Sequence, residues 1–335
     1  MANIQDVATA AGVSTASVSR YLAGQNVRAA EAIRAAIADL DYWPSTVARS
    51  LKTGRHGSIG VVVPDIMNPF FAQLVRGIEA EARRLGHQVI LANSDEGAEQ
   101  EEGLVKALIQ RIDGLIIAPI MEEDRSILSL SQMGIPVVLV DRDVTTTNYD
   151  RVLVDNLSGI KQAIDHLVSL GHTDIAFIGG PLSSTPGRAR HSGYLLSMAE
   201  HDLRYRPEYV VLSDFREDGG HVSMRELWAL SDRPTAVVIA NNLMTIGALK
   251  ALNELSVRIP AAISIIGFDD LSFANLLNPP LTVISRDDMN QGAQAARLLF
   301  DRISGERTSA GRVTTLPVNL VVRQSTSTPR EKKRS

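Results

Sequence analysis

The sequence predicts an α/β protein in which a small all-α unit precedes two doubly wound parallel sheets. Short helical patterns joined by a glycine turn occupy the first 44 residues. From residue 59 onward, short apolar runs alternate with amphipathic helical stretches, as in parallel sheets covered by helices. A length of 335 residues is long for one domain, so two or three units are expected.

The composition limits the classes of function. Lys and Arg outnumber Asp and Glu by six to four in residues 1–58, whereas the remainder has 28 against 34, so contact with a polyanion is expected in the N-terminal part. The absence of cysteine excludes disulfides and thiolate metal sites and fits a reducing compartment. No secretory signal opens the chain, and no apolar stretch approaches the roughly 18 residues of a membrane span. We therefore expect a cytoplasmic protein.

The N-terminal unit begins with two short helices separated by a tight turn. Asn3 and Asp6 have the spacing of a capping box, Gly12 makes the turn, and Ser14 caps the second helix. Ile33, Ile37 and Leu40 mark a third helical pattern, which stops before Tyr42. Two helices joined in this way form the helix-turn-helix pattern, whose second helix can enter a DNA major groove.

The second of these helices has an outward face of Ser, Thr, Ala and Arg side chains, with Val18 and Leu22 as its clear apolar anchors. Such a face is too small and too polar to be part of a core, so we expect it to lie against a partner. Residues 45–58 follow as a polar, basic, glycine-punctuated linker with one helical turn, too short to be stable alone in water.

Eight apolar runs alternate with helices in the rest of the chain and are predicted to be strands. The runs lie at residues 59–64, 88–93, 113–119, 135–141, 174–180, 209–214, 235–241 and 264–270. We expect the first four to be buried on both faces. A TIM barrel would also use eight βα steps, but additional strands at 151–156 and 282–286 disturb that count, so two open sheets facing each other across a cleft are the better interpretation. The tail at 326–335 is expected to be disordered.

Polar side chains follow the predicted strands, where ligands of open α/β sheets bind. They are Asp65, Asn68, Asn93, Asp95, Asp141, Asp214, Phe215, Asn241, Asn242, Asp269, Asp270 and Arg286. Carboxylates, amides, Arg and an aromatic ring suit a sugar-like molecule, because each hydroxyl can donate to one group and accept from another. The alternative for any single Asp or Asn is a helix cap or a turn. For Arg190, near the start of a helix, the alternative is an exposed, solvated side chain.

Signatures of catalysis and of cofactors are missing. The seven histidines show no metal-binding spacing, no glycine-rich phosphate motif occurs, and no GxSxG elbow places a nucleophile. The sequence therefore predicts no catalytic residues, no metal and no cofactor.

Several long stretches, in this order and spacing, resemble the LacI/GalR family of bacterial transcription regulators. They are "NIQDVATAAGVSTASVSRYLAG", "YWPSTVARSLKTG", "IGVVVPDIMNPFFAQLVRGIE", "VDNLSGIKQAIDHLVSLGHTDIAFIGGPLSS", "PTAVVIANNLMTIGALKAL" and "ISIIGFDD", within about residues 3–325. The resemblance implies a helix-turn-helix DNA-binding headpiece, a hinge helix and a periplasmic-binding-protein-like core that dimerises and senses a small effector, often a sugar or a sugar derivative.

The expected domain boundaries follow. The headpiece covers residues 1–44, the hinge helix and linker 45–58, and the effector-binding and dimerisation core 59–325. Within the core, an N-subdomain takes about 59–154 and 287–312, and a C-subdomain about 155–286 and 313–325.

The resemblance also assigns residues to DNA. Thr15, Ala16 and Arg20 match the base-reading face, and Arg20 has the geometry to bond guanine with two hydrogen bonds. Residues matching phosphate contacts are Ser14, Ser17 and Ser19. Leu51 matches a hinge leucine that wedges between base pairs from the minor groove.

Eight residues match the effector contacts of the family. They are Asn68, Phe70, Asp141, Arg190, Phe215, Asn241, Asp269 and Arg286. Because Arg190 and Arg286 are two cations facing one cleft, we hypothesise that the effector is an acidic sugar derivative. The implied function is that of a sequence-specific repressor whose affinity for a pseudo-palindromic operator is controlled by this molecule.

Some positions depart from the family pattern. The segment after the second helix is about two residues short, Ala23 replaces a frequent Asn, and Asn242 replaces a usual Asp, so that its role stays open. The apolar loop Leu271–Leu277 is a candidate for part of a homodimer interface, with packing on its own domain as the alternative. No leucine heptad follows Ser325, so a tetramer-forming tail is not expected.

Two other classes of function remain open at this stage. One is a non-exported sugar-binding receptor without DNA function, which the 58-residue N-terminal extension argues against. The other is a carbohydrate-acting enzyme, in which Asp141 and Asp269 would serve as acid and base.

Overall fold

The computed structural model describes residues 2–22, 24–43, 55–122, 127, 129–130, 133–145, 148–306 and 310–330. The chain divides into two compact units, Met1–Gly57 and Ser58–Ser335, which are treated separately below. Ala23, Leu51 and the predicted hinge helix around Leu51 lie outside the described residues.

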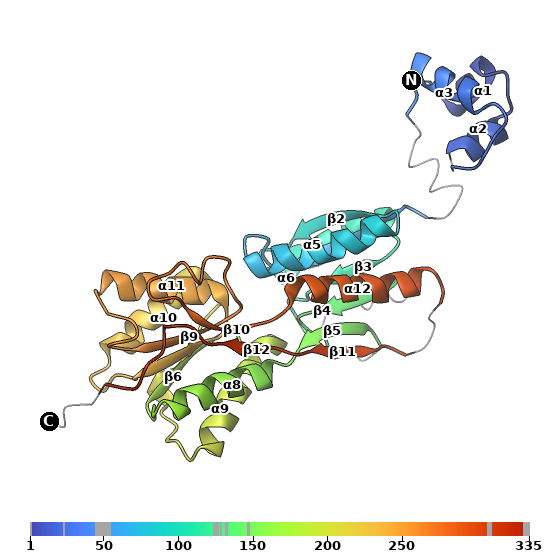
Figure 1. Cartoon of the computed structure of the whole chain (residues 1–335). Helices are drawn as coiled ribbons and strands as arrows, with labels where there is room; N and C mark the ends of the chain where they lie inside the picture. The colour runs from blue at the N-terminus through green and yellow to red at the C-terminus, as the bar shows by residue number, and fades with distance from the viewer. Residues whose placement is uncertain are drawn as a thin grey trace. The chain divides into compact units, whose positions relative to one another are not determined.

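The described residues of the first unit form a headpiece with three helices. Its helices are α1 (Ile4–Ala10), α2 (Thr15–Leu22) and α3 (Ala30–Asp39) (Figure 1). The Asn3–Asp6 capping box is present, and the Ser14 hydroxyl accepts a hydrogen bond from the Ser17 backbone N–H at 3.2 Å. Val7, Val18 and Ile33, one from each helix, are fully buried in a common core. This small core fixes the direction of α2.

The first sheet of the second unit has six strands in the order β11-β5-β4-β3-β1-β2, and all of its strand pairs are parallel. Its strands are β1 (Ser58–Val63), β2 (Gln88–Asn93), β3 (Leu115–Ile117), β4 (Val137–Val140), β5 (Asp150–Val154) and β11 (Val313–Leu316). The helices of this part are α5 (Pro69–Arg84), α6 (Ala98–Leu108), the short η1 (Ile109–Arg111) and α12 (Asp288–Ile303). We call it the first lobe.

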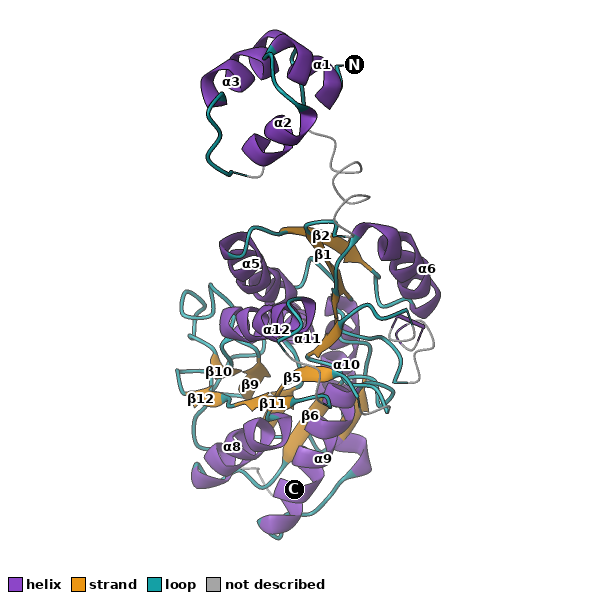
Figure 2. Ribbon diagram, turned by 90° about the vertical axis from the view of Figure 1, so that its right-hand side faces the viewer, coloured by secondary structure: helices purple, strands orange, loops and turns teal. Residues whose placement is uncertain are grey.

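The second sheet has the order β12-β10-β9-β8-β6-β7, in which only β12 is antiparallel to its neighbour among the described strands. Its strands are β6 (Ile175–Gly179), β7 (Val210–Leu212), β8 (Ala236–Ile239), β9 (Ser264–Phe268), β10 (Thr282–Ser285) and β12 (Asn319–Val321). Its helices are α8 (Asn156–Ser169), α9 (Thr185–Glu200), η2 (Pro207–Tyr209), α10 (Glu217–Ala229) and α11 (Asn242–Glu254). This second lobe is joined to the first by three crossovers, after β5, β10 and β11 (Figure 1). On the first lobe, α5 and α12 lie side by side (Figure 2).

The fold class is confirmed, but some details of the sequence prediction are wrong. Residues 313–316 form β11 beside β5, so they belong to the first lobe and not to the C-subdomain. Strand β2 was expected to be buried on both faces, yet it is an edge strand whose residues are exposed or half-buried. Strands β11 and β12 were not predicted, because they are short, lie at sheet edges and lack a continuous apolar run.

The start of the C-terminal tail is also held in place, contrary to expectation. The His166 imidazole hydrogen-bonds to the Thr326 hydroxyl at 3.0 Å, and His172 Nε2 lies 2.8 Å from the Ser327 carbonyl oxygen. Residues 331–335 lie outside the described part. Among the described residues, no helix is long and apolar enough to cross a membrane.

Helices α5 and α12 touch through glycine. A Cβ added to Gly77 would lie 2.0 Å from the Met289 carbonyl oxygen. We expect Gly77→Ala to lower the free energy of unfolding by about 1–3 kcal/mol, because the backbone of α12 must move away. Gly103→Ala, on α6, is the matched control, since its Cβ would meet nothing within 4 Å. This variant should be neutral or more stable by up to about 1 kcal/mol. Equilibrium urea unfolding compares the two, and equal effects would contradict the proposed backbone contact.

Candidate effector site and nucleic-acid interface

A cavity lies where the carboxyl ends of strands from both sheets meet. It is lined by Asp65, Asn68, Phe70, Phe71, Glu96, Asp141, Arg142, Pro186, Arg190, Phe215, Arg216, Asn241, Leu243, Asp269 and Arg286. All eight residues predicted to contact the effector are in this set. The cavity volume is about 30 Å³, which is room for a few water molecules and far below the roughly 300–1,000 Å³ of pockets that hold small-molecule ligands, so the lobes or side chains must move apart before a larger ligand fits.

Two amide side chains at the cavity are held by helix starts. Asn68 caps α5 by accepting a hydrogen bond from the Phe70 backbone N–H at 3.0 Å. Asn241 caps α11 by accepting from the Met244 N–H at 2.9 Å, and its own amide donates to the Phe215 carbonyl at 2.8 Å. Asn68 and Asn241 are polar because each caps the start of a helix that follows a turn or a strand. The same position places both side chains at the cavity.

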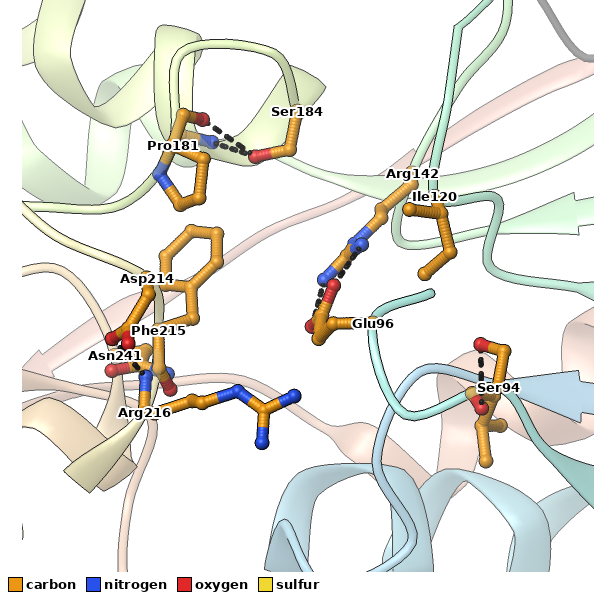
Figure 3. Close-up of polar contacts among 12 residues, drawn as sticks. Ser94, Glu96, Ile120, Arg142, Pro181, Ser184, Asp214, Phe215, Arg216 and Asn241 are labelled. Carbon is orange, nitrogen blue, oxygen red and sulfur yellow. Dashed lines mark hydrogen bonds and ion pairs between the residues drawn. The ribbon is translucent and has the colours of Figure 1, made fainter. Parts of the chain in front are cut away.

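The backbone around the cavity is left-handed at several strand ends, including Asp95 and Glu96 after β2, with φ angles of 50° and 57°. Asp141, Phe215 and Asp269, which follow β4, β7 and β9, have φ angles of 63°, 64° and 70°. Left-handed backbone costs a residue with a side chain about 1–2 kcal/mol. Residues in such conformations gather where function needs a particular side-chain direction. Phe215 and Asn241 lie together on one side of the close-up in Figure 3.

Arg286 is bound by carboxylates from both lobes. It lies 2.5 Å from Asp141 of the first lobe and 2.7 Å from Asp269 of the second, and its guanidinium stacks on the Phe70 ring at 3.5 Å. Burial alone would raise the pKa of Asp141, but Arg286 and then Arg190 hold it below its ordinary value. The Arg286 side chain is only 2% exposed. Arg286 therefore ties the lobes together. The sequence-based interpretation of Arg286 as a free cation facing the cleft is wrong.

Arg190 keeps one donor without a hydrogen-bond partner among the described residues, as Arg142 and Arg286 do at their Nε atoms. Its Nε donates to Asn156 at 2.8 Å and its Nη1 to the Ala240 carbonyl at 2.5 Å, and the guanidinium lies 3.7 Å from the centre of the Phe268 ring. Its Nη2 is buried and has no hydrogen-bond partner among the described residues. Burial lowers the pKa of Arg190 to about 10, so the side chain stays charged near neutral pH. The alternative of a solvated surface Arg is wrong.

Three ionisable residues of the cavity were missed by the sequence analysis. Arg142 binds Glu96 through two hydrogen bonds of 2.8 and 2.6 Å (Figure 3). Arg216 donates to the Asp95 carboxylate at 3.2 Å. Each missed residue directly follows a strand-end residue that the sequence had singled out, so extending each loop by one position would have found them.

Other strand-end residues have structural roles. Asn93 accepts a hydrogen bond from the Ile66 N–H at 2.7 Å, and Asp214 accepts one from the Arg216 N–H at 2.9 Å. Asp270 pairs with Arg323 at 2.7 Å. For Asn93 and Asp214 the alternative of caps and turns is correct, whereas Asp270 forms an ion pair.

Asp288, the first residue of α12, is a half-buried residue beside this cluster, with one carboxylate oxygen fully buried. One of its oxygens lies 3.5 Å from Arg286 Nε and has no hydrogen-bond partner among the described residues. Burial raises the pKa of Asp288 to about 7; Arg286 opposes the rise, and Asp269 and Asp141 add to it. The folded state then binds more protons at Asp288 than the unfolded state does, so the contribution of Asp288 to stability is full below the ordinary pKa of 3.8 and is lost as pH rises through 7.

We therefore expect Asp288→Asn to flatten the pH dependence of stability. Between about pH 5 and pH 8, the wild type should lose about 1–3 kcal/mol more free energy of unfolding than the variant, because only the wild type must ionise a buried carboxyl. Urea unfolding at both pH values measures this difference. Parallel losses in the two proteins would show that Asp288 does not titrate in this range.

Helix α2 presents the predicted base-reading residues to solvent. Thr15, Ala16 and Arg20 are exposed, whereas Val18 between them is buried. Ser14 is exposed and caps the helix. Ser17 and Ser19 are half-buried. After α2, the residue preceding α3 is Ala29, which makes no side-chain cap, in line with the departure seen in the sequence.

The comparisons with known proteins agree with this arrangement. The family described as "Bacterial regulatory proteins, lacI family" matches residues 3–45, and a periplasmic binding protein-like domain matches residues 164–326. The HTH-type transcriptional repressor PurR of Pasteurella multocida is 34% identical over 330 residues, which cover 97% of this chain and 98% of PurR.

Two solved structures extend the likeness to three dimensions. One is the lac repressor dimer bound to operator and the anti-inducer ONPF, which is 29% identical with a TM-score of 0.86, over 97% of this chain and 99% of that one. The other is a transcriptional regulator CelR–cellobiose complex, 31% identical with a TM-score of 0.75, over 97% and 100%.

These relatives are repressors and not enzymes, so the interpretation of Asp141 and Asp269 as catalytic acid and base is wrong. The match of residues 3–45 to the lacI family of regulatory proteins likewise excludes the hypothesis of a sugar-binding receptor without DNA function. With a matching helix-turn-helix headpiece and a repressor relative aligned over nearly its whole length, the chain belongs to the LacI family as a DNA-binding repressor that responds to a small effector.

Proposed function

We propose that this protein is a cytoplasmic homodimer that represses transcription from a pseudo-palindromic operator, and that a sugar or an acidic sugar derivative in the cavity controls its affinity for DNA. The proposal that an effector controls the protein is supported by the fact that the cavity residues come from both lobes. Asp141 comes from one lobe, Asp269 from the other, and Arg286 from a crossover between them. A ligand that touches all three must favour one arrangement of the lobes over another, and only this difference in affinity can drive a switch.

The chemistry of the cavity supports a polyhydroxylated ligand. Asp269, Asn68 and Asn241 offer acceptors and donors to hydroxyls, and Phe215 offers an apolar face for a sugar ring. If the ligand carries a carboxylate or phosphate, its partner is Arg190, whose Nη2 has no partner among the described residues, and not the neutralised Arg286. The cellobiose complex of a relative that aligns over 97% of this chain supports the sugar class.

A ligand screen tests this assignment. Sugars, sugar acids and sugar phosphates are added to the protein, and a ligand that binds the folded state should raise its melting temperature. Arg190→Met should weaken binding of an acidic ligand by about 10-fold or more, because a charge-assisted hydrogen bond is lost. Arg225→Met, an exposed arginine on α10, is the control and should bind as the wild type does. Tight binding of a neutral sugar, with no response to any acid or phosphate, would remove the acidic derivative from the proposal.

On the DNA side, Thr15, Ala16 and Arg20 are proposed to read base edges, with Ser14, Ser17 and Ser19 on the phosphates. Leu51 stays a prediction for the minor groove. The test starts by selecting preferred duplexes from a random library. Affinity for the selected palindrome should fall steeply with salt and should exceed that for random DNA. A log–log slope near zero, or equal affinity for both duplexes, would count against the repressor.

The dimer is proposed to form in part through the loop Leu271–Leu277. Leu271 and Ala274 are buried within their own lobe, but Phe273 and Leu276 are 40% and 80% exposed. Leu271, Ala274 and, in part, Leu277 pack internally, so Phe273 and Leu276 are the exposed apolar side chains that the loop offers to a second copy. A protein that sediments as a monomer at all working concentrations would contradict the dimer.

A further inference from the structure

A buried hydrogen bond joins the two lobes beside the cavity. The Asn242 amide Nδ2 donates to Asn68 Oδ1 at 2.9 Å. Asn242 is the first residue of α11 in the second lobe, and Asn68 precedes α5 in the first. The two side chains come from positions 174 residues apart, and only 1% and 7% of the two residues is exposed.

Backbone contacts fix which end of this bond donates. Asn68 Oδ1 also accepts the hydrogen bond from the Phe70 N–H that caps α5, at 3.0 Å. Asn242 Oδ1 accepts from the Leu243 N–H at 2.8 Å. If either amide turned over, its NH₂ group would face a backbone N–H. The donor is therefore at position 242 and the acceptor at position 68.

We infer that this bond is a latch that holds the lobes closed over the effector, and that Asn242 is a positioning residue for effector binding. The inference builds on the proposed function of the cavity. Arg286 also ties the lobes together, the Asp143 N–H donates to Thr185 Oγ1 at 3.0 Å, and the ion pairs of Arg188 with Glu122 and of Arg216 with Asp95 lie between the lobes. Both side chains of the Arg216–Asp95 pair are about half exposed, and such solvated pairs stabilise little. Breaking a buried hydrogen bond leaves a polar group without a partner and matters more.

The inference explains why an amide at position 242 matters. An Asp there would offer only acceptors, and it would place a carboxylate oxygen against the Asn68 oxygen in a buried site. An Asp at position 68 would instead keep the acceptor that both Phe70 N–H and Asn242 need, and Asp is a good helix cap. The same chemical change should therefore have opposite effects at the two ends of one bond.

Labels at the rim of the cleft can measure closure directly, without an effector. The chain has no cysteine, so Glu99→Cys on α6 and Asp218→Cys on α10, both exposed, would carry the only two spin labels. They follow the loops of Asp95 and Arg216, which touch across the cleft. Doubly labelled full-length chains, diluted into unlabelled protein to remove distances between protomers, are then compared by double electron–electron resonance.

We expect Asn242→Asp to shift the main label distance to longer values and Asn68→Asp to keep the short distance of the wild type. The double variant, with two carboxylates facing each other, should be open as well. Asn253→Asp, an exposed position on the same helix, controls for the added charge and should stay closed. Closed distances for Asn242→Asp, or equal opening by both single variants, would overturn the latch.

The effector provides a second readout. With a ligand found in the screen, Asn242→Asp should bind about ten-fold more weakly than the wild type, since part of the binding energy must close the lobes. Binding equal to that of the wild type would refute the latch while leaving the proposed function intact. A wild type that binds none of the ligands would refute the proposed effector class, and the label distances would still decide the latch.

Discussion

Replacing Arg286 with methionine is expected to lower the free energy of unfolding at neutral pH by about 3–5 kcal/mol. The guanidinium is the shared partner of Asp141 and Asp269 at 2.5 and 2.7 Å, and Asp288 lies 3.5 Å away. Methionine matches much of the volume but leaves these carboxylates buried without a countercharge, which is far less favourable than the original cluster.

The pH dependence separates this electrostatic effect from simple loss of packing. Without Arg286 the buried carboxyls hold protons more tightly in the folded state than in the unfolded state. The deficit in stability should therefore shrink as pH falls toward the ordinary pKa range of aspartate. Urea unfolding across pH measures it. Arg297→Met on α12, where the side chain is 59% exposed, is the control and should cost at most about 1 kcal/mol. A deficit independent of pH would contradict the charge argument.

Replacing Arg20 with alanine is expected to weaken operator binding by about 2–6 kcal/mol. A guanidinium that bonds a base with two hydrogen bonds contributes about 1–3 kcal/mol of discrimination, and a dimer loses it in both half-sites. Arg20 is exposed on α2, beside Thr15 and Ala16, and its Nε makes only a long 3.4 Å contact with the Ala16 carbonyl, so its remaining donors can turn toward DNA.

The measurement is anisotropy titration of the selected operator and of random duplex. Arg20→Ala should reduce the preference between them. Arg28→Ala, an exposed arginine just before α3, should weaken both alike, as loss of a phosphate contact does. Full preference for the operator in Arg20→Ala would show that other residues read the bases.

The sequence could predict most of the fold because its signals are local. Apolar runs predicted ten of the twelve strands found in the described residues, and capping residues such as Asn3, Asp6 and Ser14 marked helix starts. The two edge strands β11 and β12 were missed because their stability comes from pairing with neighbours and not from their own composition.

The candidate site was predictable only as a set of positions. The rule that ligands bind beyond strand ends collected Asn68, Asp141 and Asp269, and the structure brings them to one cavity. The rule did not separate these residues from Asn93, which accepts a backbone hydrogen bond, or from Asp270, which pairs with Arg323. The local sequence does not show which residues will be neighbours across the sheet.

The sequence by itself determined the order of the elements, the family and the residues that can line the cleft. Only the tertiary structure decided that Arg286 is neutralised, that Arg190 keeps an unpartnered donor in the described part of the chain, and that Asn242 bonds to Asn68. Periodicity and capping act over a few neighbouring residues, whereas these contacts join side chains up to 174 positions apart. Their energies depend on burial and on the partner's charge, which exist only once the lobes have folded and met.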